Sequence, residues 1–313
     1  MTEVDKPVAG ANEVLVKVGA TTVNRTDCGY RAAKPFILRF FTGLRRPKAN
    51  RRVLGTEFAG EVEALGTGVT SLQVGDRVFG YIEGPFGAHA EYLTTREDAS
   101  VAIMPAHSTF EEAAASTEGS HYALANIRAA KIARGQTVLV NGGTGAIGSA
   151  AVQLLKDLGA HVTVVCSTEH VALVKRLGAD RVIDYRATDF TTDDQTYDVI
   201  FDAAGKSSFG RCKRLLKPKG VYLSTELGPF PQNPILALIT PLFGGRRVVF
   251  PIPKHDQVMV KYIRGLVESG AFTPLIDRPY PLDEIVEAYR YVETGQKTGN
   301  VVITVAGRAD QLR

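Results

Sequence analysis

The chain has 313 residues, of which 44% are hydrophobic and 22% are charged, and it contains no low-complexity tract. This length and composition indicate a soluble globular protein with room for two domains. The three cysteines, Cys28, Cys166 and Cys212, lie far apart, which argues against a disulfide framework or a cysteine-rich zinc site. We therefore expect a reducing compartment, the cytoplasm.

The formal net charge is only +4, but the basic residues are unevenly placed. Residues 31–52 contain eight Lys or Arg and no acid, interleaved with the aromatic run Phe36–Phe41. Three interpretations stay open: a solvated surface loop, a weak contact with an anionic membrane, and a lid over an anionic cofactor. No apolar run approaches the roughly 20 residues that span a bilayer, since the longest, Pro234–Phe243, is about half that length.

The first third of the chain predicts an irregular β domain. Short alternating segments separated by Gly- and Pro-rich turns are typical of strands. These segments are 13–18, 55–64 and 77–80.

From Phe110 onward the pattern changes to alternating helices and strands. Residues 111–133 form an Ala-rich helical segment, with Ser108 or Thr109 as its N-cap. Strands are predicted at 137–141, 161–166, 181–184, 198–202, 220–224 and 247–251, and helices at about 146–158, 169–177, 206–216 and 231–243. This alternation predicts a mostly parallel sheet with helices on both faces. A last helix at 281–295 precedes a strand at 300–305, which we expect to complete the first domain.

The turn between the first of these strands and its helix is the strongest motif. Gly143, Gly145 and Gly148 match G-x-G-x-x-G, and Gly142 adds a second glycine spacing. In this pattern the glycines allow a tight turn, close approach of a pyrophosphate and close helix packing. The helix N-terminus then offers free N–H groups to the phosphates. We predict a dinucleotide site formed by Gly142, Gly143, Thr144, Gly145, Ala146, Ile147 and Gly148.

The end of the second strand favours NADPH over NADH. An acidic residue there would bind the ribose of NAD, but the position holds Cys166. Side chains that can bind a 2′-phosphate follow it: Ser167, Thr168, His170 and Tyr185. Glu169 favours the alternative, NADH, and Ser167 and Thr168 could also simply cap the next helix. Ala204, Leu223, Ser224 and Thr225 end the fourth and fifth strands, where we expect the nicotinamide ribose.

These features together resemble the medium-chain dehydrogenase/reductase superfamily, and most closely its zinc-independent quinone oxidoreductase branch. The matching stretches span nearly the whole chain: 13–17, 24–27, 54–60, 74–78, 138–159, 177–180, 201–205 and 299–302. The resemblance implies a Rossmann doubly wound parallel sheet inserted between two parts of a GroES-like irregular β-barrel. The expected catalytic domain is 1–107 plus 257–313, and the expected NAD(P)-binding domain is 108–256.

The resemblance also predicts that no zinc is bound. The Cys, His and Cys ligands of zinc-dependent relatives correspond to Asn24, Thr56 and Ser116, which are poor zinc ligands. Two acids in the same stretches, Asp27 and Glu57, are expected to be structural and paired with basic neighbours. Without a Lewis acid, reduction of a quinone or an α,β-unsaturated carbonyl is easier than oxidation of an alcohol.

Four residues are candidates for catalysis. By the resemblance, Asn24 donates to the substrate oxygen and Thr26 occupies a proton-relay position, although each could instead cap a turn or helix. His121 could donate a proton, or be a hydrogen-bonded structural residue. Tyr30 lies one position from an active-site tyrosine of some quinone reductases. Ser120 matches a residue that touches the nicotinamide amide.

We therefore predict an NADPH-dependent reductase of a small hydrophobic quinone or enone, with no nucleic-acid partner. The alternatives are a zinc-free alcohol dehydrogenase and a non-catalytic NADPH sensor or membrane-associated protein. The family implies a homodimer paired through the strand that begins at Arg247. The natural substrate is left open.

Overall fold

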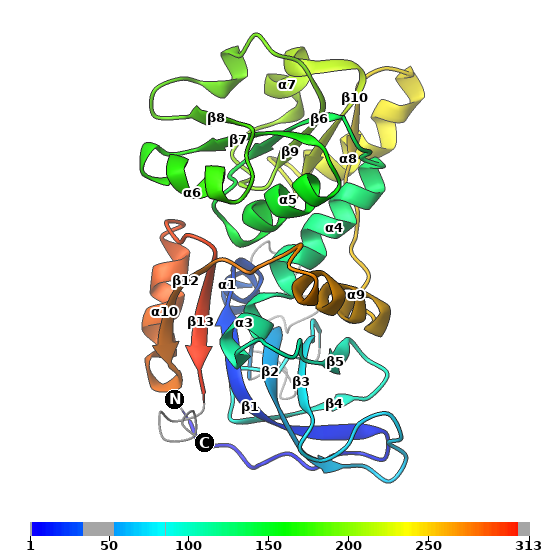
Figure 1. Cartoon of the computed structure of the whole chain (residues 1–313), viewed down its shortest axis with the longest axis vertical. Coiled ribbons are helices and arrows are strands. Elements are labelled where there is room, and N and C mark those ends of the chain that lie inside the picture. Colours follow the sequence, from blue (N-terminus) through cyan, green and yellow to red (C-terminus); the bar gives the residue numbers. More distant parts are fainter. Residues whose placement is uncertain (1, 34–52, 85, 306–313) are drawn as a thin grey trace. The chain divides into compact units, whose positions relative to one another are not determined.

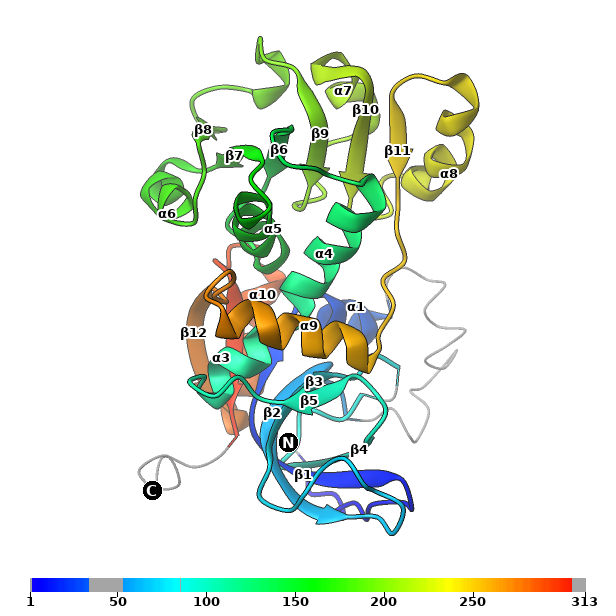
Figure 2. The ribbon, with the colours of Figure 1, turned by 45° about the vertical axis from the view of Figure 1, so that its right-hand side comes forward.

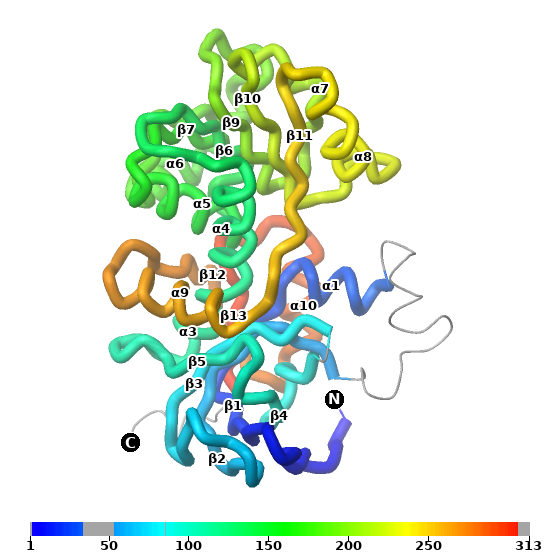
Figure 3. The backbone as a smooth tube through the Cα atoms, turned by 90° about the vertical axis from the view of Figure 1, so that its right-hand side faces the viewer, coloured from blue at the N-terminus to red at the C-terminus, as the bar shows by residue number. Residues whose placement is uncertain are grey.

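The computed structural model describes residues 2–33, 53–84 and 86–305. The chain divides into two compact units: a first unit of Met1–Glu118 and His255–Arg313, and a second unit of Gly119–Lys254. Figure 1 colours both units by sequence. The chain leaves the second unit after β11 (Arg247–Val249) and enters α9 (Gln257–Glu268) of the first, as Figure 3 traces.

The described part of the first unit is built on a seven-stranded sheet in the order β12-β13-β1-β2-β3-β5, with β4 also paired to β1. Every pairing is antiparallel except that of β12 with β13. The strands are β1 (Glu13–Val23), β2 (Glu57–Leu65), β3 (Arg77–Tyr81), β4 (Tyr92–Arg96), β5 (Val101–Ile103), β12 (Ile276–Pro281) and β13 (Asn300–Thr304). The closing strand β13 pairs with the second half of β1.

Strand β1 is longer than predicted. Its residues beyond Val18 are all buried and pair with β13, so their pattern is continuous burial rather than alternation. The same unit holds α1 (Arg25–Ala32), α3 (Phe110–Ala115), α9 and α10 (Ile285–Glu293).

The predicted helix 111–133 is in fact two helices. Helix α3 ends at Ala115, and α4 (Glu118–Ala130) starts after a break. Thr109 caps α3 through a capping box with Glu112. Because α3 packs on β1, β2 and β13, residues 108–118 group with the first unit and not with the second, where we had expected them.

The second unit holds a six-stranded parallel sheet in the order β11-β10-β9-β6-β7-β8. Its strands are β6 (Thr137–Asn141), β7 (His161–Cys166), β8 (Arg181–Asp184), β9 (Tyr197–Asp202), β10 (Leu216–Ser224) and β11. Its helices include α5 (Ala146–Asp157), α6 (Val171–Arg176), α7 (Phe209–Cys212) and α8 (Gln232–Ile239), with α8 beside β11 in Figure 2. The chain order reverses between β6 and β9, the switch point at which doubly wound sheets bind ligands.

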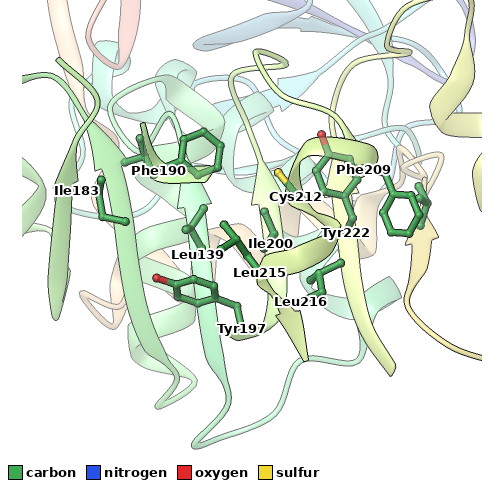
Figure 4. Packing of buried hydrophobic residues seen from close by; sticks show 12 residues of the cluster. Leu139, Ile183, Phe190, Tyr197, Ile200, Phe209, Cys212, Leu215, Leu216 and Tyr222 are labelled. Atoms are coloured by element: carbon green, nitrogen blue, oxygen red, sulfur yellow. The ribbon is translucent and has the colours of Figure 1, made fainter. Parts of the chain in front are cut away.

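Helices cover both faces of this sheet, as predicted. On one face Leu139 and Ile200 pack with Phe209 and Cys212 of α7, a cluster drawn in Figure 4. Neighbouring strand residues point to opposite faces. Val164 accordingly lies on the other face, where it and Val152 of α5 are both within 4 Å of a Cβ built on Gly143.

Candidate active site

Three glycines of the turn after β6 are required by the backbone itself. Gly142 has φ +84°, a conformation that disfavours other residues. A Cβ on Gly143 would lie 2.2 Å from Val164 Cγ1, and one on Gly148 would lie 2.1 Å from Gly142 O. Close packing of the turn against β7 and α5 therefore excludes any side chain at these positions.

Gly145 differs, because the space beside it is open. It is the N-cap of α5 and supplies no side-chain cap. The nearest described atom to a Cβ there is Gly142 O, 3.9 Å away. The first N–H groups of this 12-residue helix therefore face a cradle that a side chain would fill. That arrangement fits the pyrophosphate of a dinucleotide.

The ends of β7 and β8 bring together the residues predicted to choose between NADP and NAD. Ser167 Oγ lies 2.9 Å from His170 Nδ1, and Thr168 donates to Asp184 Oδ2 at 2.6 Å. Tyr185 is 56% exposed and available to a ligand. Cys166 is buried, so it cannot take the place of a ribose-binding acid.

Arg186 is a cation at this edge that sequence reasoning missed. Its guanidinium lies 3.1 Å from Glu169, the residue that favoured NADH, and both side chains are exposed. Because surface ion pairs are weak, Arg186 can exchange this partner for a phosphate. The signal for it in the sequence was its position directly after Tyr185, a residue predicted to bind the 2′-phosphate.

The ends of β9 and β10 are held by a buried aspartate. Asp202 is fully buried and accepts hydrogen bonds from Asn141 Nδ2 (2.9 Å), Tyr222 OH (3.1 Å) and Ser207 N (2.9 Å). Ala204 lies on the turn that follows, against Gly142. The side chains of Leu223 and Ser224 are buried, so these positions can offer a ligand only backbone groups.

In the first unit, Asn24 is the N-cap of α1. Its Oδ1 accepts a hydrogen bond from Asp27 N at 2.8 Å. Asp27 Oδ2 in turn accepts a hydrogen bond from Asn24 N, which completes a capping box. Its amide Nδ2 donates to Thr56 Oγ1 at 2.9 Å and, more weakly, to Glu57 Oε2 at 3.4 Å. Asn24 therefore caps α1, which was the alternative role left open for it. Its amide is also a donor to Thr56 and Glu57.

Glu57 is the centre of this arrangement, which we call the Glu57 network (Thr22, Asn24, Thr56, Glu57 and Thr117). The side chain is fully buried, and its carboxylate accepts from Thr22, Asn24, Thr117 Oγ1 (2.7 Å) and the backbone N–H of Glu118 (2.6 Å). These donors compensate for the loss of hydration, which is costly for a carboxylate. We had expected Glu57 to be paired with basic neighbours, but these four donors are all hydroxyl or amide groups.

Asp27 was also expected to pair with a base, and its neighbour is His89. The His89 Nε2 atom lies 3.8 Å from Asp27 Oδ2 and 2.8 Å from Thr22 O. Burial lowers the pKa of His89 to about 4, so the ring is neutral at physiological pH. Burial also raises the pKa of Asp27. This contact is therefore not an ion pair at neutral pH.

The remaining catalytic candidates have separate partners. Thr26 Oγ1 lies 2.6 Å from Glu118 Oε1. Tyr30 donates to Glu83 at 3.0 Å, and Glu83 also accepts from Tyr81 and contacts His255 Nε2 at 3.1 Å. The side chains of Thr26 and Tyr30, both on α1, thus hydrogen-bond to two different carboxylates.

Ser120 and His121 belong to the second unit, where both are buried near the start of α4. The His121 ring packs against Tyr122, with the ring centroids 5.6 Å apart.

Two surface segments were singled out in the sequence. Of the basic segment 31–52, only residues 31–33 lie within the described chain, where Arg31 pairs with Glu293 and lies over the Tyr289 ring. The apolar run 234–243 is exposed at Leu238, Leu242 and Phe243. None of the helices in the described ranges combines the length and apolar character needed to cross a membrane.

Comparison with known proteins agrees with this geometry. Residues 10–106 match the family model of an alcohol dehydrogenase GroES-like domain, and residues 177–303 match that of a zinc-binding dehydrogenase. The chain is 33% identical over 303 residues to the 2-methylene-furan-3-one reductase of Solanum lycopersicum, covering 93% of this chain and 71% of the relative. The chain belongs to the medium-chain dehydrogenase/reductase superfamily. Within the superfamily it is quinone oxidoreductase-like.

Two further relatives support this placement in the superfamily. The NADPH-dependent alkenal/one oxidoreductase of Arabidopsis thaliana is 30% identical over 308 residues, which cover 95% of this chain and 73% of the relative. The solved quinone oxidoreductase of Coxiella burnetii superposes with a TM-score of 0.84 at 27% identity, covering 97% of this chain and 93% of that one. The predicted fold class, a Rossmann sheet with a GroES-like domain, is confirmed.

The two hydroxyls that follow α3, on Ser116 and Thr117, have different partners. Ser116 donates to Ala113 O at 2.7 Å, within its own helical turn. Thr117, the next residue, reaches Glu57 beside Asn24 and Thr56. No group of three His, Cys, Asp or Glu side chains within the described ranges is placed to hold a metal ion.

Proposed function

We propose that this protein is an NADPH-dependent oxidoreductase that transfers hydride to quinones or α,β-unsaturated carbonyls without zinc. One observation carries the proposal: an amide and two hydroxyls, from Asn24, Thr56 and Thr117, lie together beside Glu57, and by the family resemblance Asn24 and Thr56 stand at two of the zinc-ligand positions. Such groups are poor zinc ligands but good hydrogen-bond partners for an oxyanion. The activities for which the alkenal/one and quinone oxidoreductase relatives are named support the same substrate class.

The side chains of the first unit suit this chemistry. NADPH, when bound, supplies the hydride that adds to the electron-poor carbon of the acceptor. Negative charge then develops on the acceptor oxygen. Of the two Asn24 N–H groups, the one directed at Glu57 makes a long bond of 3.4 Å. We propose that this N–H gives up its long bond to Glu57 and donates to the acceptor oxygen. The bond to Thr56 holds the amide in place.

For the cofactor, we propose that Gly142–Gly148 binds the pyrophosphate and that Ser167, Thr168, His170 and Tyr185 bind the 2′-phosphate. Arg186 joins this second group, because its guanidinium lies at the same sheet edge beside Glu169. Ala204, Leu223, Ser224 and Thr225 line the nicotinamide ribose, and Ser120 the nicotinamide amide. Tyr30 and His121 remain candidates for the acceptor site.

We also propose a homodimer. Strand β11 lies at the edge of the second unit's sheet and is free to pair with another copy. The exposed side chains of Leu242 and Phe243 precede it in the chain and add apolar surface.

Turnover of a small acceptor panel tests the proposed activity. We expect the purified protein to oxidise NADPH with 1,4-benzoquinone, 9,10-phenanthrenequinone, an alkenal or a cyclic enone, and NADH more slowly. Absorbance of the reduced cofactor at neutral pH measures the rate. A chelator should leave the rate unchanged. Tight NADPH binding with no turnover of any acceptor would instead favour the sensor.

Substitution of Arg186 tests the assignment of NADPH. Arg186→Ala should raise KM for NADPH about tenfold, roughly the loss of one partly screened phosphate contact, and leave KM for NADH unchanged. Arg211→Ala is the matched control, because Arg211 is an equally exposed arginine of the same unit that pairs with Asp189. Equal effects of Arg186→Ala on the two cofactors would remove Arg186 from the 2′-phosphate site.

A further inference from the structure

The hydroxyl of Thr26 lies within hydrogen-bond distance of a buried carboxyl group. Glu118 is only 5% exposed, whereas Thr26 is partly exposed, and Thr26 Oγ1 lies 2.6 Å from Glu118 Oε1. Both residues belong to the first unit. The partly exposed Thr26 hydroxyl therefore contacts an acid that is itself almost inaccessible to solvent.

The charges around Glu118 favour its protonated form. Burial raises the pKa of this carboxyl well above its usual range, and the negative charge of Glu57 raises it further. Two groups act in the opposite direction: the hydrogen bond from Thr26 and the positive charge of Lys297, on the loop before β13. Burial lowers the pKa of Lys297, and the charges of Glu118 and Glu57 oppose that shift.

The neighbouring acids are less suited to release a proton through Thr26. The Glu57 carboxylate already accepts four hydrogen bonds, none of them from Thr26. Asp27 Oδ2 is engaged by the backbone of Asn24 in the capping box. Of these three acids, Glu118 alone makes a hydrogen bond to Thr26 in the described chain.

We propose that Glu118 is the proton reservoir for the reduction of α,β-unsaturated carbonyls, acting through the Thr26 hydroxyl. The inference rests on the function proposed above. Hydride addition forms a C–H bond at the β-carbon, and the π electrons move to the carbonyl oxygen as an enolate. The Thr26 O–H bond breaks as its proton passes to the enolate, and Thr26 takes the proton of Glu118. Glu118 is left as a carboxylate near Lys297 and is reprotonated from water.

The proposal predicts a difference between two acceptor classes. An enolate must gain a proton to yield the product ketone, whereas a hydroquinone anion can leave and take its proton from water. Glu118→Gln should therefore lower kcat on a cyclic enone about 100-fold, in the range for loss of an acid–base group, and lower kcat on 1,4-benzoquinone less than about threefold. Glu61→Gln, on an exposed glutamate of the same strand as Glu57, should change neither rate.

The pH profile gives a second readout that a structural role would not change. Only protonated Glu118 can deliver a proton, so wild-type kcat on the enone should fall as pH rises through the raised pKa of Glu118. Glu118→Gln should lose this fall. Thr26→Val should behave like Glu118→Gln, and Thr26→Ser should restore the enone rate, because serine keeps the hydroxyl.

The outcomes separate this inference from the function on which it rests. If wild-type protein turns over neither enone nor quinone, the proposed function fails. If wild type is active but Glu118→Gln keeps the enone rate, or loses both rates equally with an unchanged pH profile, the role of Glu118 is overturned. If Glu118→Gln does not fold, the two Thr26 variants take its place. Loss of the enone rate in Thr26→Val and its recovery in Thr26→Ser would support the proton relay, and an unchanged enone rate in Thr26→Val would overturn it.

Discussion

Substitution of Gly145 by aspartate should abolish NADPH binding while the second unit stays folded. Gly145 has φ −72° and ψ 170°, which any residue adopts, and a side chain there meets open space. Aspartate is also a favourable N-cap, better than glycine by roughly a few tenths of a kcal/mol. Its carboxylate would occupy the cradle and repel the pyrophosphate. We expect Kd for NADPH to rise at least about 100-fold, or roughly 3 kcal/mol.

Calorimetric titration with NADPH measures this loss, and thermal unfolding checks the fold. Gly145→Asn is the matched control, because it adds nearly the same volume and capping oxygen without the charge, and it should weaken binding less. Gly148→Ala should instead destabilise the unit itself, since its Cβ would lie 2.1 Å from Gly142 O. If Gly145→Asp binds NADPH within threefold of wild type, the pyrophosphate does not lie at this helix.

Substitution of Asn24 by serine should separate the two roles that the structure gives this residue. Serine keeps an oxygen that can cap α1, as Asn24 Oδ1 does for Asp27 N, but it removes the amide that faces Thr56 and Glu57. Loss of one donor to a developing oxyanion lowers turnover by about 100- to 1,000-fold. We expect that loss in kcat on the best acceptor, with KM for NADPH nearly unchanged.

Asn24→Ala serves as the comparison, because it removes the cap as well. It should lose a similar amount of activity and about 1 kcal/mol more stability than Asn24→Ser, measured by urea unfolding. Wild-type turnover by Asn24→Ser would show that Asn24 is only the cap of α1. In that case the oxyanion would need a different donor.

Much of the second unit was predictable because its signals are local. The strands 137–141, 161–166 and 181–184 coincide with β6, β7 and β8, since each is a short apolar run bounded by turn residues. The glycine spacing at Gly142–Gly148 is likewise readable from consecutive residues. Boundaries were less predictable where one helical segment is interrupted, as at the break between α3 and α4.

Contacts between distant residues were not predictable, because spacing along the chain does not place two side chains together. Glu57 and Thr117 are 60 positions apart, and Thr26 and Glu118 are 92 apart. Ser116 and Thr117 are adjacent hydroxyl residues, yet Ser116 bonds within its own helical turn and Thr117 donates to Glu57, a difference that their order in the chain does not show. Arg186 was missed for the same reason, since its relation to Glu169 depends on the pairing of β7 with β8.

The sequence by itself determined the superfamily, the alternating fold of the second unit and the glycine turn for a dinucleotide. It did so because backbone periodicity and glycine conformation are local properties. Only the tertiary structure decided that Glu57 is surrounded by hydroxyl and amide donors, and that Glu118 stands behind Thr26 as a buried acid. Those assignments depend on burial and on the charges of residues that folding brings together.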